Sequence, residues 1–218
     1  MDYVRRSGWG AGEPRGKPIA IPTPVRDLFL HHSVTPDNGP DTVRAIQRFH
    51  QDTRGWADIA YTVVHSPKHR VFFEGRGFGI SGAHTRGHNR TAHGLCVLGN
   101  YDHAKPTSDL IDDLAEFLRW HAGAYGASRF RPHHDVGATA CPGGNLTAVI
   151  ADINLEAERD FTPPQPPADY TEPADEPAPA WSFDDYREQT REWIAERVEP
   201  TFGSYDAWSE AVRRFGDD

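Results

Sequence analysis

Three residues of this 218-residue chain have the chemical types and the placement to bind a metal ion. His31 directly follows an apolar run at 28–30, while His133 and Cys141 lie together in the segment 131–143. Two imidazoles and one thiolate suit zinc, and three protein ligands leave the fourth position open for water or substrate. An open position is typical of a catalytic site rather than of a structural one, so the pattern favours a metal-dependent enzyme.

Two further side chains are placed to assist such a metal. Zinc would lower the pKa of a bound water toward about 7 and would polarise a carbonyl oxygen. Tyr61 lies at the start of an expected strand, from which its phenol can reach that water. Thr139 precedes Cys141 by two residues and can donate a hydrogen bond to a developing oxyanion. The alternative is that these are chance placements in a chain with 12 histidines, with Tyr61 a core residue and Thr139 a turn residue.

Residues 1–155 are expected to form one domain of the α/β or α+β class. Clusters of β-branched, aromatic and leucine residues bounded by turn residues predict strands at 27–30, 59–64, 71–74, 94–98 and 129–131. Apolar residues at helical spacing predict helices at 41–52 and 108–124, and a short one at 146–153. We expect Asp41 and Ser108 to cap the two longer helices and Gly126 to end the second.

The composition changes after residue 155. Residues 156–180 are rich in proline and acidic residues, so they cannot form a core, and we expect an extended linker there. The prolines of this stretch are Pro163, Pro164, Pro166, Pro167, Pro173, Pro177 and Pro179. Residues 181–218 predict two short helices, a small module that buries too little to be secure alone. This module would dock on the first domain, self-associate or bind a partner.

The charge distribution argues against nucleic acid as a partner. Residues 1–155 hold 17 basic and 15 acidic residues, while residues 156–218 hold 6 basic and 17 acidic ones. There is no basic stripe, and the acidic tail would repel a phosphate backbone. We expect no membrane partner either, because no apolar stretch approaches the roughly 20 residues of a membrane span. Residues 1–6 also lack the apolar region of a secretory signal.

The second cysteine, Cys96, is interpreted as a core residue. It lies in an apolar run at 94–98 that predicts a buried strand, where a free cysteine acts as a small hydrophobic side chain. A disulfide between Cys96 and Cys141 is the alternative, although no spacing in the chain specifically favours it.

Seven segments, in order, resemble the zinc-dependent N-acetylmuramoyl-L-alanine amidases of the peptidoglycan-recognition-protein superfamily, the type 2 amidases that include phage endolysins. The resemblance covers about residues 6–150. The segments are WGA at 9–11, LHHS at 30–33, GWADIAY at 55–61, FEGRG at 73–77, GAHT at 82–85 with Asn89, VLGNY at 97–101 and HHDVGATACPG at 133–143.

The resemblance implies a central mixed β-sheet flanked by helices, with a peptidoglycan groove above one zinc ion. It implies that the ligands are His31, His133 and Cys141, so that the first histidine of each His-His pair binds the metal. The reaction implied is hydrolysis of the amide between N-acetylmuramic acid and L-alanine. Tyr61 would orient or deprotonate the water, and Thr139 would stabilise the tetrahedral oxyanion.

Four further residues are candidate contacts for a muropeptide. His84 and Asn89 lie in a matched segment, and Trp56 and Arg76 can line the groove. For Trp56 the alternative is a core position, and for Arg76 it is an ion pair, for instance with Glu74. His32 and His134 are interpreted as supporting residues, since adjacent strand residues point to opposite faces. The remaining histidines, His50, His65, His69, His88, His93, His103 and His121, are given no role.

Together these features predict a phage endolysin, made in the host cytoplasm and acting on the bacterial cell wall after release. One alternative is a cytoplasmic amidase that recycles muropeptides. Another is a module that binds peptidoglycan without cutting it. Loss of the cysteine ligand commonly marks such non-cutting members, so the presence of Cys141 favours an enzyme. The C-terminal module would then bind the cell wall or self-associate.

Overall fold

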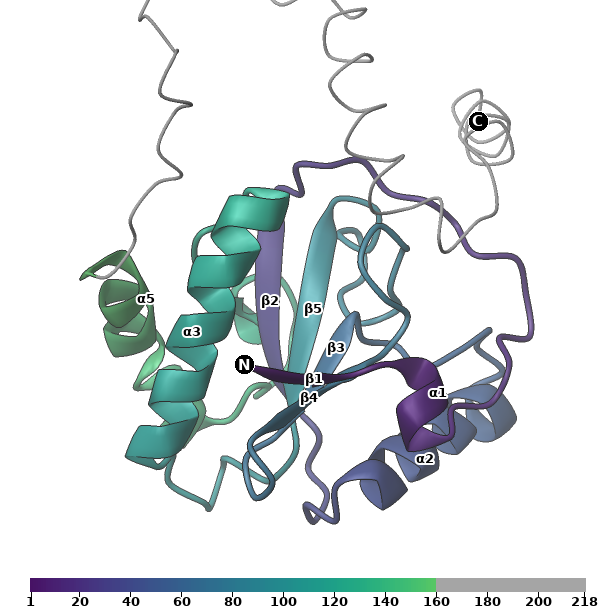
Figure 1. The fold of residues 1–218 in the computed structure, drawn as a ribbon, viewed down its shortest axis with the longest axis horizontal. Coiled ribbons are helices and arrows are strands. Elements are labelled where there is room, and N and C mark those ends of the chain that lie inside the picture. The colour runs from purple at the N-terminus through teal and green to yellow at the C-terminus, as the bar shows by residue number, and fades with distance from the viewer. Residues whose placement is uncertain (160–218) are drawn as a thin grey trace, which may run out of the picture. The chain divides into compact units, whose positions relative to one another are not determined.

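The computed structural model describes residues 1–159, in which one β-sheet is covered by helices (Figure 1). The predicted linker beyond residue 159 and the predicted module at 181–218 lie outside the described residues. The strands are β1 (Asp2–Val4), β2 (Asp27–His32), β3 (Val63–Ser66), β4 (Val71–Glu74), β5 (Ala92–Val97) and β6 (Phe130–Pro132). The α-helices are α1 (Arg6–Trp9), α2 (Pro40–Arg48), α3 (Ser108–Tyr125), α4 (Gly144–Thr147) and α5 (Ile150–Arg159); a π-helical turn spans Phe49–Thr53 and a 3-10 turn spans His133–Asp135.

The sheet has the strand order β1-β4-β3-β5-β2-β6. β3 and β4 are antiparallel and every other neighbouring pair is parallel, which confirms the predicted mixed sheet. The central strands β2 and β5 are buried at all six positions of each, because helices cover both faces. Their pairing places Cys96 beside His31.

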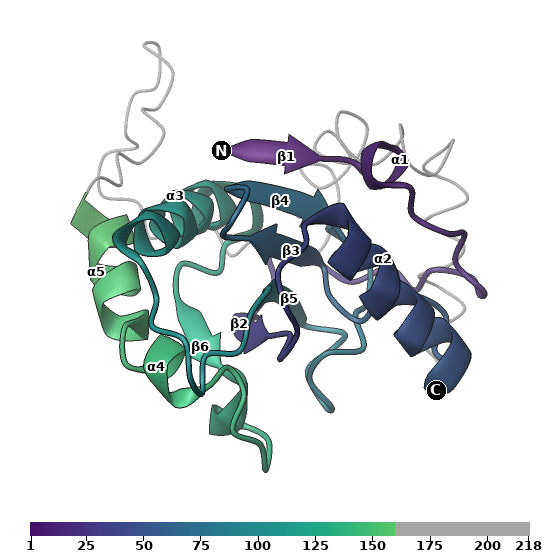
Figure 2. The ribbon, with the colours of Figure 1, turned by 90° about the horizontal axis from the view of Figure 1, so that it is seen from below.

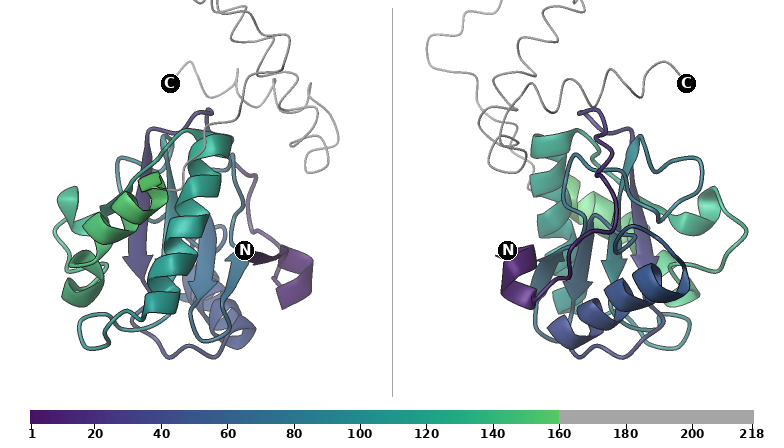
Figure 3. Two further views of the ribbon diagram at one scale, coloured as in Figure 1. Left: turned by 60° about the vertical axis from the view of Figure 1, so that its left-hand side comes forward. Right: turned by 90° about the vertical axis from the view of Figure 1, so that its right-hand side faces the viewer.

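The two faces of the sheet carry different helices (Figures 2 and 3). On one face α3 packs with α5 behind it, and Phe117 of α3 stacks on Phe72 of β4 at 5.1 Å between ring centroids. On the other face α1 and α2 cover a cluster that includes Val64, Phe73 and Cys96. Side chains paired across neighbouring strands share a face, so His31 lies on the α2 face with Cys96.

The helix predicted at 41–52 begins and ends differently. Gly39, with a φ of +60°, is the N-cap residue, and Pro40 takes the first helical position, which suits its fixed φ. Asp41 therefore lies in the first turn, where it pairs with Arg44, instead of capping the helix. The last part of the predicted helix is the π-helical turn Phe49–Thr53, a widening that often occurs at functional sites.

The strand predicted at 59–64 is displaced toward the C-terminus, since β3 begins only at Val63. The carbonyl groups of Tyr61 and Thr62 instead accept backbone hydrogen bonds from Arg76 and Gly75, both at 2.9 Å. A Cβ on Gly75 would lie 2.2 Å from the carbonyl oxygen of Tyr61, so this approach requires glycine. Tyr61 thus lies outside the sheet ladder, before the first residue of β3.

The longest helix follows its prediction closely. α3 spans Ser108–Tyr125 and ends at Gly126, as predicted. Its cap is Thr107 rather than Ser108, because the Thr107 hydroxyl oxygen accepts the backbone N–H of Leu110 at 3.2 Å. No helix within residues 1–159 has both the length and the apolar character needed to cross a membrane.

The helix predicted at 146–153 is two helices, α4 and α5. α5 continues to Arg159, so residues 156–159 belong to a helix and not to the predicted linker. Ile153 and Ala157 of α5 are buried, which gives these residues a core contact that composition alone does not show.

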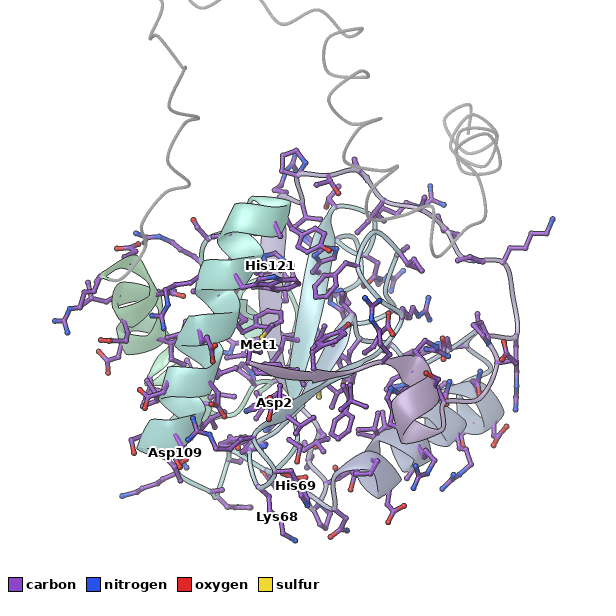
Figure 4. All side chains as sticks on the ribbon, viewed as in Figure 1. Met1, Asp2, Lys68, His69, Asp109 and His121 are labelled. Atoms are coloured by element: carbon purple, nitrogen blue, oxygen red, sulfur yellow. The ribbon has the colours of Figure 1, made fainter. Side chains whose placement is uncertain are left out.

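A pair of buried histidines lies between the sheet and α3. Nδ1 of His93 in β5 is 2.9 Å from Nε2 of His121 in α3, and Nδ1 of His121 donates to the Ala127 carbonyl at 2.9 Å. Figure 4 places His121 on α3. Burial lowers the pKa of His121 to about 4, against a weaker opposing effect of the Ala127 carbonyl, so both imidazoles remain neutral in the folded protein.

Because of this histidine pair, we expect acid to destabilise the folded protein. A histidine in the unfolded chain takes a proton below its pKa of about 6.5, whereas His121 in the folded chain does so only near pH 4. The contribution of the buried, neutral His121 to the free energy of unfolding is therefore complete above about pH 6.5 and falls as the pH approaches 4. We expect the stability difference between the wild type and His121→Gln to shrink by about 1–2 kcal/mol from pH 7.5 to pH 5. Urea unfolding at both values measures it, and a constant difference would contradict the prediction.

Candidate metal centre

The edge at which β2 and β6 end brings distant parts of the chain together. His31 is the fifth of the six residues of β2 and is 2% exposed. β6 pairs in parallel with β2, and His133 follows it directly at the start of the 3-10 turn. Cys141 returns to the same place because the backbone N–H of His134 donates to its carbonyl at 3.1 Å. Parallel pairing and one loop thus bring together side chains that are about 100 residues apart in the sequence.

The three side chains have a spacing that fits a zinc ion. Nδ1 of His31 lies 3.5 Å from Sγ of Cys141, and the rings of His31 and His133 are 4.6 Å apart. The candidate ligand atoms of all three lie within 4.8 Å of one another. Tetrahedral zinc, with Zn–S near 2.3 Å and Zn–N near 2.0–2.1 Å, requires a nitrogen–sulfur separation of about 3.5 Å. The donor set therefore fits the metal that the sequence predicts.

Burial sets the protonation state of these groups. It lowers the pKa of His31 well below the ordinary value, with a further contribution from neighbouring histidines, and it also lowers the pKa of His133. Burial raises the pKa of the Cys141 thiol to about 11, although the backbone N–H of His32 acts in the opposite direction. The imidazoles thus offer lone pairs near neutral pH while the thiol keeps its proton. Both Cys96 and Cys141 are free, so the structure does not contain the alternative disulfide.

The centre lies in a cleft of about 510 Å³. Tyr61, Thr139, Trp56 and His84 line this cleft, so four of the residues singled out in the sequence surround the three candidate ligands. The Tyr61 ring is 5.4 Å from that of His31. The other lining residues are His31, His32, Val34, His50, Arg54, Ala60, Ala83, Asp102, His133, Ala140 and Cys141.

Tyr61 and Thr139 both keep a hydroxyl proton in the cleft. Burial raises the pKa of Tyr61 well above its ordinary value, so its side chain remains a phenol. The hydroxyl oxygen of Thr139 accepts the backbone N–H of Cys141 at 3.1 Å. That bond leaves the hydroxyl proton of Thr139 available to a group in the cleft.

Sequence reasoning missed His50, which was given no role. This residue lines the main cleft and also a neighbouring cleft of about 610 Å³, and it is 4.9 Å from the Trp56 ring. Its Nδ1 accepts the backbone N–H of Ala60 at 3.1 Å, which places any single proton on Nε2. Its position in the π-helical turn is the structural reason that it reaches the cleft, and sequence periodicity does not reveal such a turn.

Two predicted contact residues lie elsewhere. Arg76 donates to the carbonyls of Ile59 at 2.7 Å and Ser81 at 2.9 Å, so its guanidinium ties loops together. Asn89 accepts the backbone N–H groups of His84 and Thr85, both at 2.9 Å. Neither Arg76 nor Asn89 is among the residues that line the two clefts.

The two histidines interpreted as supporting residues both bond to backbone groups near the centre. Nδ1 of His32 accepts the backbone N–H of Tyr101 at 3.1 Å, which anchors the loop after β5. Nδ1 of His134 lies 3.2 Å from the Cys141 carbonyl oxygen and so reinforces the loop that returns the cysteine.

A mixed sheet that presents two histidines and a cysteine in a cleft defines a candidate metal-dependent hydrolase. Comparison with known proteins supports the hydrolase part of this class. The family model described as N-acetylmuramoyl-L-alanine amidase matches residues 22–144, and the chain belongs to this family.

Relatives and solved structures extend the comparison. Human N-acetylmuramoyl-L-alanine amidase is 36% identical over 158 residues, covering 66% of this chain and 27% of the relative. Peptidoglycan-recognition protein LB of Drosophila melanogaster is 32% identical over 158 residues, covering 68% and 67%. The chain thus spans about a quarter of the length of the human relative.

The fold matches solved recognition proteins. The wild-type Drosophila PGRP-LB structure aligns with a TM-score of 0.62 and 28% identity, covering 69% of this chain and 91% of that one. The structure of peptidoglycan recognition protein-LE in complex with tracheal cytotoxin aligns with a TM-score of 0.63 and 28% identity, covering 67% and 92%.

The pKa shifts predict that zinc binding releases one proton from the protein. Near neutral pH both imidazoles are already neutral, whereas the Cys141 thiol, with its pKa raised to about 11, must ionise to bind a metal. Zinc affinity should therefore rise about tenfold per pH unit between pH 7 and 9. Competition with a chromophoric chelator, corrected for its own protonation, measures this slope. A slope near zero would show that the thiol is already ionised.

Proposed function

We propose that this chain hydrolyses the amide between N-acetylmuramic acid and L-alanine in peptidoglycan, using one zinc ion held by His31, His133 and Cys141. The observation that carries the proposal is the 3.5 Å separation of Nδ1 of His31 and Sγ of Cys141 in a cleft that His133 also lines. Family membership supports it, because the human relative carries the name of this activity. Peptidoglycan as the ligand is supported by the LE relative, whose structure holds a monomeric peptidoglycan.

Zinc, when bound at these residues, supplies a Lewis acid that activates water and polarises the scissile carbonyl. The side chains of the protein form the cleft in which that chemistry takes place. Trp56 and His50 pack together on the cleft, with their ring centroids 4.9 Å apart, and offer an aromatic surface to the substrate. Exposed Val34 adds an apolar group to the same cleft.

Tyr61 orients the attacking water. In the metal-free protein, burial raises the pKa of its phenol well above the ordinary value, so the group carries a proton there. The phenol is a hydrogen-bond donor and acceptor that lies beside His31. It can thus direct the attacking water toward the carbonyl carbon without itself ionising.

Thr139 stabilises the oxyanion that develops on the carbonyl oxygen. The bond from the Cys141 N–H occupies the Thr139 oxygen as an acceptor, so the hydroxyl proton can be donated to negative charge in the cleft. A donor placed in this way before the reaction stabilises the transition state more than the ground state.

The wider setting of this activity stays a prediction from the sequence. A phage endolysin, made in the host cytoplasm and released to the cell wall, is the setting that we propose, with a wall-binding or self-associating C-terminal module. Lysis of intact cells when the enzyme is added from outside, compared with lysis when it is expressed inside together with a membrane-permeabilising protein, tests this setting.

Digestion of purified peptidoglycan tests the reaction itself. We expect the zinc-loaded wild type to release new N-terminal alanine without new reducing sugar, and a zinc chelator to abolish the release. Cys141→Ser should lose this activity while it keeps the thermal stability of the metal-free wild type, because serine is a poor zinc ligand at neutral pH. Binding to peptidoglycan with no release of either product would instead identify a recognition module that does not cut.

The role of Thr139 predicts a specific kinetic loss. Thr139→Ala should lower kcat by about 10²-fold or more, because one oxyanion donor is removed. Thr139→Ser keeps the hydroxyl and should retain most of the activity. Zinc affinity is measured in parallel, since Thr139 also contacts the Cys141 backbone. Near-wild-type turnover of the alanine variant would remove Thr139 from the mechanism.

A further inference from the structure

The His31 ring has different neighbours at its two nitrogens. Nδ1 lies 3.5 Å from Sγ of Cys141, on the side of the metal position. Nε2 lies 3.2 Å from Nδ1 of His84 and 3.4 Å from the hydroxyl oxygen of Thr85. One nitrogen therefore faces the other metal ligands, and the other faces a pair of residues that follow one another in the chain.

This arrangement constrains the tautomer of His31. A neutral imidazole carries one proton, so a ring that binds metal through Nδ1 must carry its proton on Nε2. His31 is 2% exposed, and a buried N–H without an acceptor is destabilising. We propose that His84 and Thr85 are positioning residues, which accept this N–H and thereby hold His31 in its metal-binding tautomer. The inference rests on the proposed zinc site and assigns these residues a role without substrate contact.

Two glycines make room for the His84 ring beside His31. A Cβ on Gly94 would lie 2.5 Å from Cγ of His84, and a Cβ on Gly82 would lie 2.3 Å from its Cδ2. Gly94 lies inside β5, where glycine weakens a strand and often marks the close approach of another group. Gly94 and Cys96 share one face of β5, so the His84 ring occupies the space next to the position paired with His31.

The backbone of the pair is fixed by Asn89. Its side-chain oxygen accepts the N–H groups of His84 and Thr85, both at 2.9 Å, and the Thr85 hydroxyl oxygen lies 2.9 Å from Nδ1 of His84. Thr85 is 1% exposed, so its hydroxyl is closed to a substrate and serves the interior. Asn89 thus supports the metal centre through His84 and Thr85, and its contact with a muropeptide stays a prediction.

Substitutions in the full chain distinguish the loss of a hydrogen-bond acceptor for His31 from a general disruption of the fold. Thr85→Val removes the hydroxyl at nearly constant shape, Thr85→Ser restores it, and His84→Phe fills the glycine-lined space without an acceptor. Thr91→Val and His121→Phe are matched controls that do not line the cleft, because the Thr91 hydroxyl contacts the His88 carbonyl and His121 packs against the opposite face of the sheet. Thermal unfolding confirms that each variant is folded.

Two measurements test the proposal. The first is the zinc Kd from chelator competition, which should weaken about 10–100-fold in His84→Phe and less in Thr85→Val, with Thr85→Ser near the wild type. The second is the His31 tautomer in the metal-free protein, read from two-bond 1H–15N NMR correlations. We expect a proton on Nε2 in the wild type and in both controls, and a mixture of tautomers in His84→Phe.

The outcomes distinguish this inference from the function on which it rests. Zinc affinity and a His31 tautomer unchanged in both His84→Phe and Thr85→Val would overturn the positioning role while leaving the zinc amidase in place. A wild type that binds no zinc would refute the zinc site itself. Equal weakening of zinc binding in the matched controls would show that the effect is one of general stability, and it would also overturn the proposal.

Discussion

The parallel pairing of β2 with β5 on one side and with β6 on the other is the constraint on which the centre depends. Neighbouring parallel strands end at a common edge of the sheet, so residues far apart in the sequence arrive at the same place. His31 is carried there by β2, and His133 follows the end of β6. Helices on both faces bury β2 and its neighbour β5 completely, so the strand that carries His31 has a rigid base.

Burial also determines the chemistry of the side chains at this edge. It lowers the pKa of His31 and His133 and raises that of Tyr61 and Cys141, so both imidazoles are neutral and the phenol and the thiol keep their protons. A neutral set of donors in a partly buried cleft provides lone pairs without charge repulsion between the ligands. A divalent cation there reverses this balance, because its charge favours the thiolate over the thiol.

Much of the candidate centre could be predicted because its residues lie in short, distinctive segments. His31, His133 and Cys141 meet, and Tyr61, Thr139, Trp56 and His84 line the same cleft. The side chains of Arg76 and Asn89 bond to backbone groups, and their contact with a muropeptide stays a prediction. A sequence motif predicts that a residue is important, but it does not show whether that residue contacts a ligand or other parts of the protein.

The sequence by itself determined the types of the candidate metal ligands, the mixed class of the fold and the long helix α3, because composition, spacing and helical periodicity are local properties. Only the tertiary structure decided what depends on packing between distant segments. The displaced start of β3 follows from carbonyls that bond to the chain after β4, and His50 reaches the cleft through a π-helical turn. The need for Gly82 and Gly94 is visible only in the folded protein, because the His84 ring occupies the space that a Cβ at either position would take.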